Sequence, residues 1–289
     1  MKVKSMVKVA SVVLASGLIL VACQKNLDSK SAQSPRSTDL QHVTDIAALQ
    51  SIITQEDATQ FALALSPSST ISQSILAGSC PPITTDAHPG IYPDTITVDW
   101  GTGCSSGGIT RSGKTIRVYT GDMANTGSEV TTSYDNFFFN GYKFEGKVKM
   151  AHNLRTINPQ NQYRLTYLDR KIIQPSGDYV ITNGYITIRK LDTTAEYPGF
   201  PDGRFRTNGT TTNDELKAGN TYQYIDSIDE ANPITYNFCQ FATKGIKIIS
   251  FNNGDPSWIV NYGKVGQCDV FADVTINGVT TTVILPLAP

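Results

Sequence analysis

The chain has little of what metal centres and nucleic-acid surfaces need. Its 289 residues include 3 histidines and 5 cysteines, and no two cysteines have the CxxC spacing typical of zinc sites. We therefore expect no metal and no other cofactor. Lysine and arginine number 24 against 25 acidic residues and form no cluster. Phosphate binding needs grouped positive charge, so we also expect no nucleic-acid partner.

The sequence offers little for catalysis. A serine nucleophile needs a positioned histidine and an acid, but His42 falls in a segment of helical spacing, His88 in a turn and His152 just past a strand. Asp99 and Glu145 lie on predicted strands, where alternation places both on the water-facing side. The sequence favours a protein that is not an enzyme. A carboxylate-dependent hydrolase stays open, because distant strands can bring two carboxylates together.

The first residues have the pattern of an export signal. Three lysines precede an apolar run, Val9–Leu20, that is too short to span a bilayer permanently. The run ends in Leu-Val-Ala-Cys23, which resembles the lipobox of bacterial lipoproteins. We expect residues 1–22 to be removed and Cys23 to carry acyl chains such as palmitate. Gln24, in place of the aspartate that retains lipoproteins in the inner membrane, indicates the outer membrane, with the protein facing the periplasm or the cell surface.

The remaining chain divides by composition into three parts. Residues 23–39 are polar and aperiodic, as expected of a lipidated flexible tether. Residues 40–79 show helical spacing, and Thr54 followed by acidic residues predicts the N-cap of a second short helix. Residues 80–289 contain strands and turns, which predicts a β domain behind short N-terminal helices.

Alternation and turn chemistry define the predicted strands. Ile96, Val98 and Trp100 fall on one face of their segment, and Ile116 and Val118 share a face of the next. Asn-Gly pairs, a strong hairpin signal, begin at residues 140, 183, 208, 253 and 277. The pair at 183 predicts a reversal or a bulge. This density of turns predicts a mainly β fold, an antiparallel meander of hairpins forming a curved sheet or a sandwich.

Two cysteine regions of the chain resemble each other. Val98-Asp99-Trp100-Gly101 leads to Cys104, and Val260-Asn261-Tyr262-Gly263 leads to Cys268; a glycine-centred reversal, Ser112-Gly113 or Asn277-Gly278, follows each. We interpret residues 80–120 and 239–289 as a pseudo-repeat. Four cysteines allow three pairings, and equivalent positions in the two repeats favour the disulfides Cys80–Cys104 and Cys239–Cys268.

The block VDWGTGC, the turn RSGK and the hairpin NGY between Thr95 and Val148 carry a family resemblance. They resemble a family of uncharacterised envelope lipoproteins from Bacteroidetes-type bacteria. The resemblance implies an envelope protein and transfers no reaction and no catalytic residue.

Consecutive aromatics at Phe137, Phe138 and Phe139 place apolar groups on both faces of one strand. Three hypotheses follow. The first is an outer-membrane-anchored, non-enzymatic binding or structural module, whose partners besides the membrane are an envelope protein, a glycan or an apolar ligand. The second is a carrier whose apolar cavity is lined by Phe137, Phe139, Tyr142 and Phe144. The third is the hydrolase above, with two carboxylates in one cleft.

Overall fold

The structure is a computed structural model, which describes residues 36–65, 88, 90–106, 108–152, 162–191, 204–237, 242–263 and 271–284. All of them belong to one unit, Ala32–Pro289. The elements are α1 (Ser37–Leu65), β1 (Asp94–Asp99), β2 (Cys104–Ser106), β3 (Ile109–Tyr119), β4 (Glu129–Phe139), β5 (Tyr142–His152), β6 (Gln162–Ile173), β7 (Tyr179–Lys190), β8 (Arg204–Lys217), β9 (Asn220–Ile228), β10 (Ile234–Asn237), β11 (Ile246–Phe251), β12 (Trp258–Asn261), β13 (Phe271–Ile276) and β14 (Val279–Ile284).

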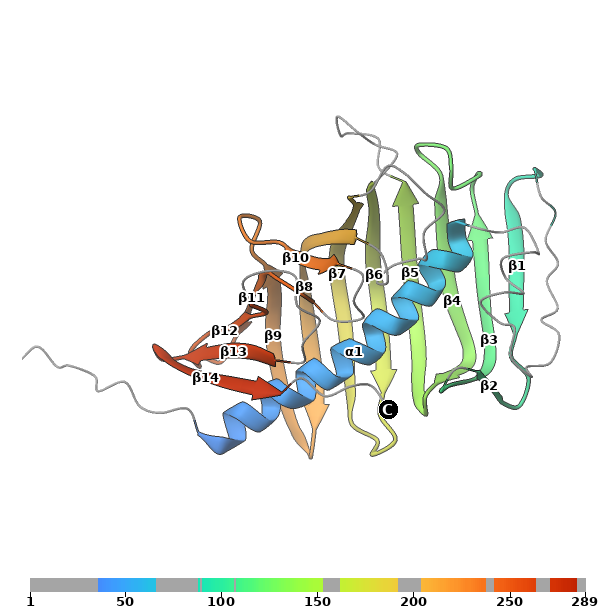
Figure 1. The fold of residues 1–289 in the computed structure, drawn as a ribbon. Helices are drawn as coiled ribbons and strands as arrows, with labels where there is room; N and C mark the ends of the chain where they lie inside the picture. The colour runs from blue at the N-terminus through green and yellow to red at the C-terminus, as the bar shows by residue number, and fades with distance from the viewer. Residues whose placement is uncertain are drawn as a thin grey trace, which may run out of the picture. The chain divides into compact units, whose positions relative to one another are not determined.

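The described strands form one 14-stranded sheet in which most neighbours in space are neighbours in sequence. The order runs β1-β3-β4-β5-β6-β7-β8-β9-β11-β12-β13-β14, while β2 pairs with β3 and β10 with the start of β8. Every pairing is antiparallel. The prediction of an antiparallel meander is confirmed, and the sheet is open and curved (Figure 1).

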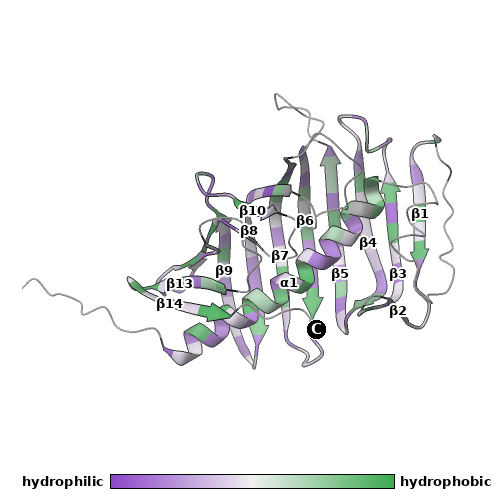
Figure 2. Cartoon of the chain, in the orientation of Figure 1, coloured by the Kyte–Doolittle hydropathy of each residue, from purple (hydrophilic) through white to green (hydrophobic). Residues whose placement is uncertain are grey.

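Among the described residues one helix, α1, crosses one face of this sheet obliquely (Figure 1). Its N-terminal half packs on β9 and β11–β14 through Val43 and Ile46. Its C-terminal half packs on β1–β8 through residues such as Ile52 and Phe61. In Figure 2 apolar and polar residues alternate along the strands and along α1, as expected of elements with one buried face.

The prediction of short N-terminal helices was wrong, because α1 is one continuous 29-residue helix about 43 Å long. Thr54 lies inside it and caps nothing. Neither glycine nor proline interrupts the chain between Ser37 and Leu65, so nothing stops the helix there. The acids after Thr54, which suggested a first helical turn, instead face buried cations of the sheet.

The Asn-Gly pairs have two structural roles. The pairs at 140, 253 and 277 form the turns between β4 and β5, β11 and β12, and β13 and β14. Those at 183 and 208 lie inside β7 and β8, so no reversal occurs there. At Gly184 φ is +116° and an added Cβ would lie 2.5 Å from the backbone oxygen of Thr210. Glycine is required here by close strand approach rather than by a turn.

The predicted reversal at Ser112-Gly113 was also wrong, because both residues lie inside β3. The register between β3 and β4 shifts there, and further shifts occur at Ser133/Phe137, Glu145/Lys147 and Tyr167/Arg170 in the next three pairings. These irregularities follow one another across β3–β7. Bulges bend and twist strands, so we attribute the curvature of the sheet around α1 to these four successive register shifts.

The inward face of β3 is not the one that hydropathy suggests. Ile116 and Val118 share a face, as predicted, but Val118 is 41% exposed on the side away from α1. Thr115, Arg117 and Tyr119 are buried on the side that faces α1, with Arg117 only 2% exposed. The inward face of this strand is therefore polar.

Candidate functional site

Charged side chains are buried between α1 and the sheet. The sheet supplies Arg111, Arg117, Arg170 and Lys247, each no more than 5% exposed. Three buried acids lie near these cations, Glu56 and Asp57 of α1 and Asp226 of β9, and a fourth, Glu215 of β8, faces His42 of α1 instead. We call these eight residues the polar seam. Buried charges are stable only when they are paired and hydrogen-bonded, so the seam constrains where α1 can lie.

Asp57 is the centre of the seam. Its Oδ1 lies 2.8 Å from Nη1 of Arg170, and its Oδ2 accepts a 2.8 Å hydrogen bond from the hydroxyl of Tyr167. The guanidinium of Arg170 also lies 3.7 Å from the ring centroid of Tyr167. Burial and the Asp57 carboxylate hold the pKa of Tyr167 well above its usual value, so this hydroxyl is a donor at neutral pH.

Glu56 lies near two arginines without a direct ion pair to either. Its Oε1 accepts a hydrogen bond from Gln60, whose own oxygen accepts one of 2.9 Å from Nε of Arg117. Burial raises the pKa of Glu56 to about 7, against the opposing effects of Arg111 and the Gln60 hydrogen bond. Arg111 lies between the rings of Trp100 and Phe139, with both centroids 5.0 Å away.

The N-terminal half of α1 is held by a second buried pair. Nε2 of His42 lies 2.8 Å from Oε2 of Glu215. The rings of Tyr222 and Trp258 flank the imidazole, with centroids at 4.5 and 5.5 Å. This residue therefore packs as part of the interface between α1 and the sheet.

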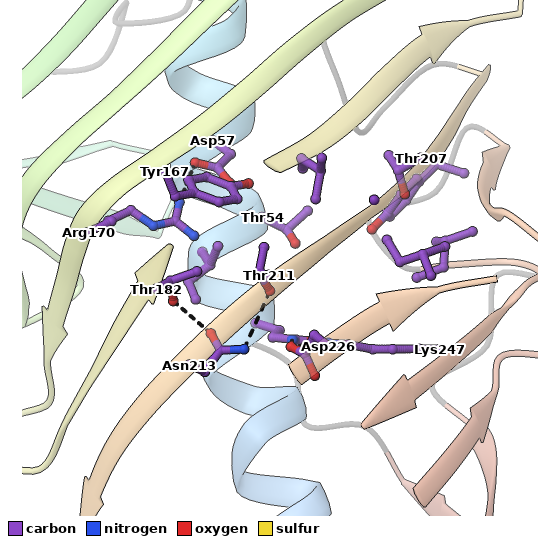
Figure 3. Close-up of a pocket in the computed structure, with 17 residues that line it drawn as sticks. Thr54, Asp57, Tyr167, Arg170, Thr182, Thr207, Thr211, Asn213, Asp226 and Lys247 are labelled. Atoms are coloured by element: carbon purple, nitrogen blue, oxygen red, sulfur yellow. Dashed lines mark hydrogen bonds and ion pairs between the residues drawn. The ribbon is translucent and has the colours of Figure 1, made fainter. Parts of the chain in front are cut away.

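A cavity of about 110 Å³ opens in the seam between α1 and β6–β11 (Figure 3). Gln50, Ile53, Thr54 and Asp57 of α1 form one side, and residues of β6–β11 form the other. One water molecule needs roughly 10–15 Å³ of such space, so the cavity has room for several waters or one small organic molecule.

Two ion pairs border this cavity. The first is Asp57 with Arg170, and the second is Asp226 with Lys247, whose Oδ2 and Nζ are 2.9 Å apart. Gln50 donates a 2.8 Å hydrogen bond to the same Oδ2. The formal charges on the cavity wall therefore sum to zero.

Neutral polar groups line the rest of the wall. The hydroxyl of Thr182 donates to Oδ1 of Asn213 at 2.9 Å, and Nδ2 of Asn213 donates to the hydroxyl of Thr211 at 3.4 Å (Figure 3). Thr207 is only 3% exposed, and its hydroxyl has no hydrogen-bond partner among the described residues. Isoleucines 53, 186, 228 and 234 supply the apolar part of the wall.

The aromatic residues proposed to face an apolar ligand lie elsewhere. Phe137, Phe139 and Phe144 are completely buried and pack ring against ring, with centroids 6.0 and 6.3 Å from Phe144. Tyr142 packs on the same cluster. None of the four borders the cavity. They form the core beneath the C-terminal half of α1.

Most of the predicted cysteine chemistry falls outside the described residues, which include neither Cys23, Cys80, Cys239 nor Cys268. Cys104, on β2, is buried and disulfide-bonded, with its partner outside the described residues. The pairings Cys80–Cys104 and Cys239–Cys268 stay predictions.

The other catalytic candidates are at the surface or in the packing. Asp99 pairs with Lys114 at 3.1 Å and Glu145 with Lys143 at 2.8 Å, and neither carboxylate borders the cavity. His88 is largely exposed beside Asp94. His152 is the last residue of β5, not one beyond it, and stacks on Tyr163 with centroids 4.8 Å apart.

Residues 103–107 read GCSSG and so fit the pattern of a serine nucleophile elbow. That motif needs a strand followed by a helix. Here Ser105 lies on β2, its hydroxyl is 3.1 Å from that of Thr110, and β3 follows. The local fold is a hairpin rather than an elbow.

Two further features are absent from the described residues. These residues contain no group of three or more His, Cys, Asp or Glu side chains placed to hold a metal ion. No helix within them is both long enough and apolar enough to cross a membrane.

Fold and site together define a class: an antiparallel β protein with one open curved sheet, crossed by a helix over a polar cavity. Comparisons with protein families, with curated proteins and with solved structures found no match.

Proposed function

We propose that this chain is an exported lipoprotein, anchored to the outer membrane through Cys23, which binds a small polar ligand in the cavity beneath α1 and catalyses no reaction. The observation that carries the binding proposal is the cavity, whose wall combines two ion pairs with hydroxyl and amide groups. Ligand sites in proteins are concave and present a few placed polar groups on an apolar wall. The anchoring proposal is supported by the sequence around Cys23.

The apolar carrier is the weaker alternative. Its predicted aromatic lining is packed core, and the cavity wall carries hydroxyl groups and an ammonium whose remaining protons an apolar ligand would leave without water or partners. A binding site for a polar molecule fits the same wall without that cost.

One observation favours the hydrolase: Asp57 and Asp226 border the same cavity. Both are already acceptors, Asp57 from Arg170 and Tyr167 and Asp226 from Lys247 and Gln50. A general acid must donate a proton to the leaving group. Glu56, whose pKa is raised to about 7, does not border the cavity. Binding without turnover is therefore preferred.

Binding can be tested through isoleucine methyl groups. The purified protein, labelled with ¹³C at isoleucine δ1 methyls, is titrated separately with glucose, alanine, acetate, methylammonium and decanoate. A ligand in the cavity shifts the methyls of Ile186, Ile228 and Ile234 saturably, while those of the buried residues Ile96 and Ile276 stay unchanged. If none of these compounds shifts the cavity methyls saturably, the binding proposal is wrong.

Anchoring is tested independently in cells of a bacterium that processes lipoproteins. Labelled palmitate is expected to enter the wild-type protein and leave it in the membrane fraction, whereas Cys23→Ser abolishes both. Equal labelling of the wild type and the Cys23→Ser variant would contradict the assignment of the lipidated residue.

A further inference from the structure

The charge balance of the cavity restricts which ligands it accepts. Its two carboxylates and two cations are already paired at 2.8 and 2.9 Å. A ligand with a charged group, including a zwitterion, would have to break one of these pairs or bury that group without a counterion, and both are unfavourable in a low-dielectric interior. An uncharged ligand avoids both penalties.

The unused hydrogen-bonding capacity specifies the ligand further. Thr207 is 3% exposed and borders the cavity, and its hydroxyl has no hydrogen-bond partner among the described residues. The hydroxyl of Thr211 accepts from Asn213 and keeps its own proton for donation. The ammonium of Lys247 has three protons, of which the contact with Asp226 uses one. Hydroxyls donate and accept, so the best complement is a ligand whose groups also do both.

Apolar surface completes the match. Ile186 and Ile228 border the same space as these polar groups, so the wall also offers van der Waals contacts for the carbon atoms of a ligand. A molecule with hydroxyls on a carbon skeleton satisfies both kinds of surface.

We infer that the ligand is a small uncharged polyhydroxy compound, a polyol or a single sugar ring, held by Thr207, Thr211 and Lys247. This inference rests on the proposed binding function and names the chemical class of its ligand. Amino acids, carboxylates, amines and fatty acids are the classes it excludes.

The test extends the isoleucine methyl titration with matched variants. Glycerol, myo-inositol and glucose represent the proposed class. Thr207→Val keeps the shape of the side chain and removes its hydroxyl, while Thr210→Val makes the same change at an exposed position of the same strand. Loss of one hydrogen bond corresponds to a roughly 3- to 10-fold weaker affinity. We expect this loss for Thr207→Val and an unchanged affinity for Thr210→Val.

The outcomes separate the two proposals. Saturable shifts with at least one neutral polyol, weakened by Thr207→Val alone, support the inference. Saturable shifts only with alanine, acetate, methylammonium or decanoate overturn the ligand class and leave the binding function standing. Equal affinities in both valine variants overturn the role of Thr207, and no shift with any compound overturns the binding function itself.

Discussion

Removal of the Asp57 carboxylate should be among the most destabilising changes in this protein. Asp57→Ala leaves the guanidinium of Arg170, 1% exposed, without its counterion and the hydroxyl of Tyr167 without its acceptor. Breaking a buried pair on one side costs about 3–5 kcal/mol. With an m-value of about 2 kcal/mol per molar urea, the unfolding midpoint should fall by roughly 1.5–2.5 M.

The assay is urea unfolding at pH 7 followed by tryptophan fluorescence, because both tryptophans, Trp100 and Trp258, are buried. Asp99→Ala is the matched control: it removes a carboxylate from a solvent-accessible pair with Lys114, so its unfolding midpoint should change far less than that of Asp57→Ala.

A second variant separates the ion pair from general damage to the interface. When Asp57→Leu is combined with Arg170→Met, no buried charge remains unpaired, so the double variant should be more stable than Asp57→Ala. The ion pair does not hold α1 as described if Asp57→Ala is no more destabilising than Asp99→Ala. The same conclusion follows if the double variant loses as much stability as the single variants Asp57→Leu and Arg170→Met lose together.

Three further predictions follow from other parts of the fold. Because the pKa of Glu56 is raised to about 7, its contribution to stability is complete below about pH 4.5 and is lost as pH rises through 7. The free energy of unfolding of Glu56→Gln should therefore exceed that of the wild type by about 3 kcal/mol at pH 8 and by little at pH 4.5. A difference in urea midpoints that does not change with pH would contradict this. Gly184→Ala should destabilise by more than about 2 kcal/mol and Gly254→Ala, at positive φ but with open space, by about 1 kcal/mol; equal losses in thermal unfolding would argue against the close strand contact. Peptide mapping of the oxidised protein should recover Cys104 linked to Cys80, and a link from Cys104 to either other downstream cysteine would refute the predicted pairing.

The strand pattern was readable from sequence because it depends on local signals. Alternation around Ile96 and Val98 and the Asn-Gly pair at 140 reflect strand periodicity and turn geometry, which act within a few residues. The Asn-Gly pair at 183 could not be assigned the same way. Its glycine is required because the backbone of Thr210 on the next strand lies too close for a Cβ, and that contact exists only once β7 and β8 have paired.

The site was missed because its residues contradict hydropathy. Arg117 alternates with Ile116 and Val118, so a pattern rule turns the arginine outward, whereas the structure buries it against Gln60. Glu56 was interpreted as part of a helix cap for a similar reason: the two arginines near it, Arg111 and Arg117, are more than fifty residues away in the chain. The presence of arginines within predicted strands was a usable signal for a buried polar site. Alternation alone, however, does not say which face of the strand an arginine occupies.

The strand order has a consequence for how the protein matures. Hairpins between consecutive strands join residues close in the chain, so each strand can pair with the preceding one as the polypeptide is released. The helix, although made first, has no such freedom: His42 meets Glu215, 173 positions later, and Ile46 packs in the cluster that includes β13 and β14. The helix can complete its contacts only after β13 and β14 have joined the sheet, so its docking is the last step of folding.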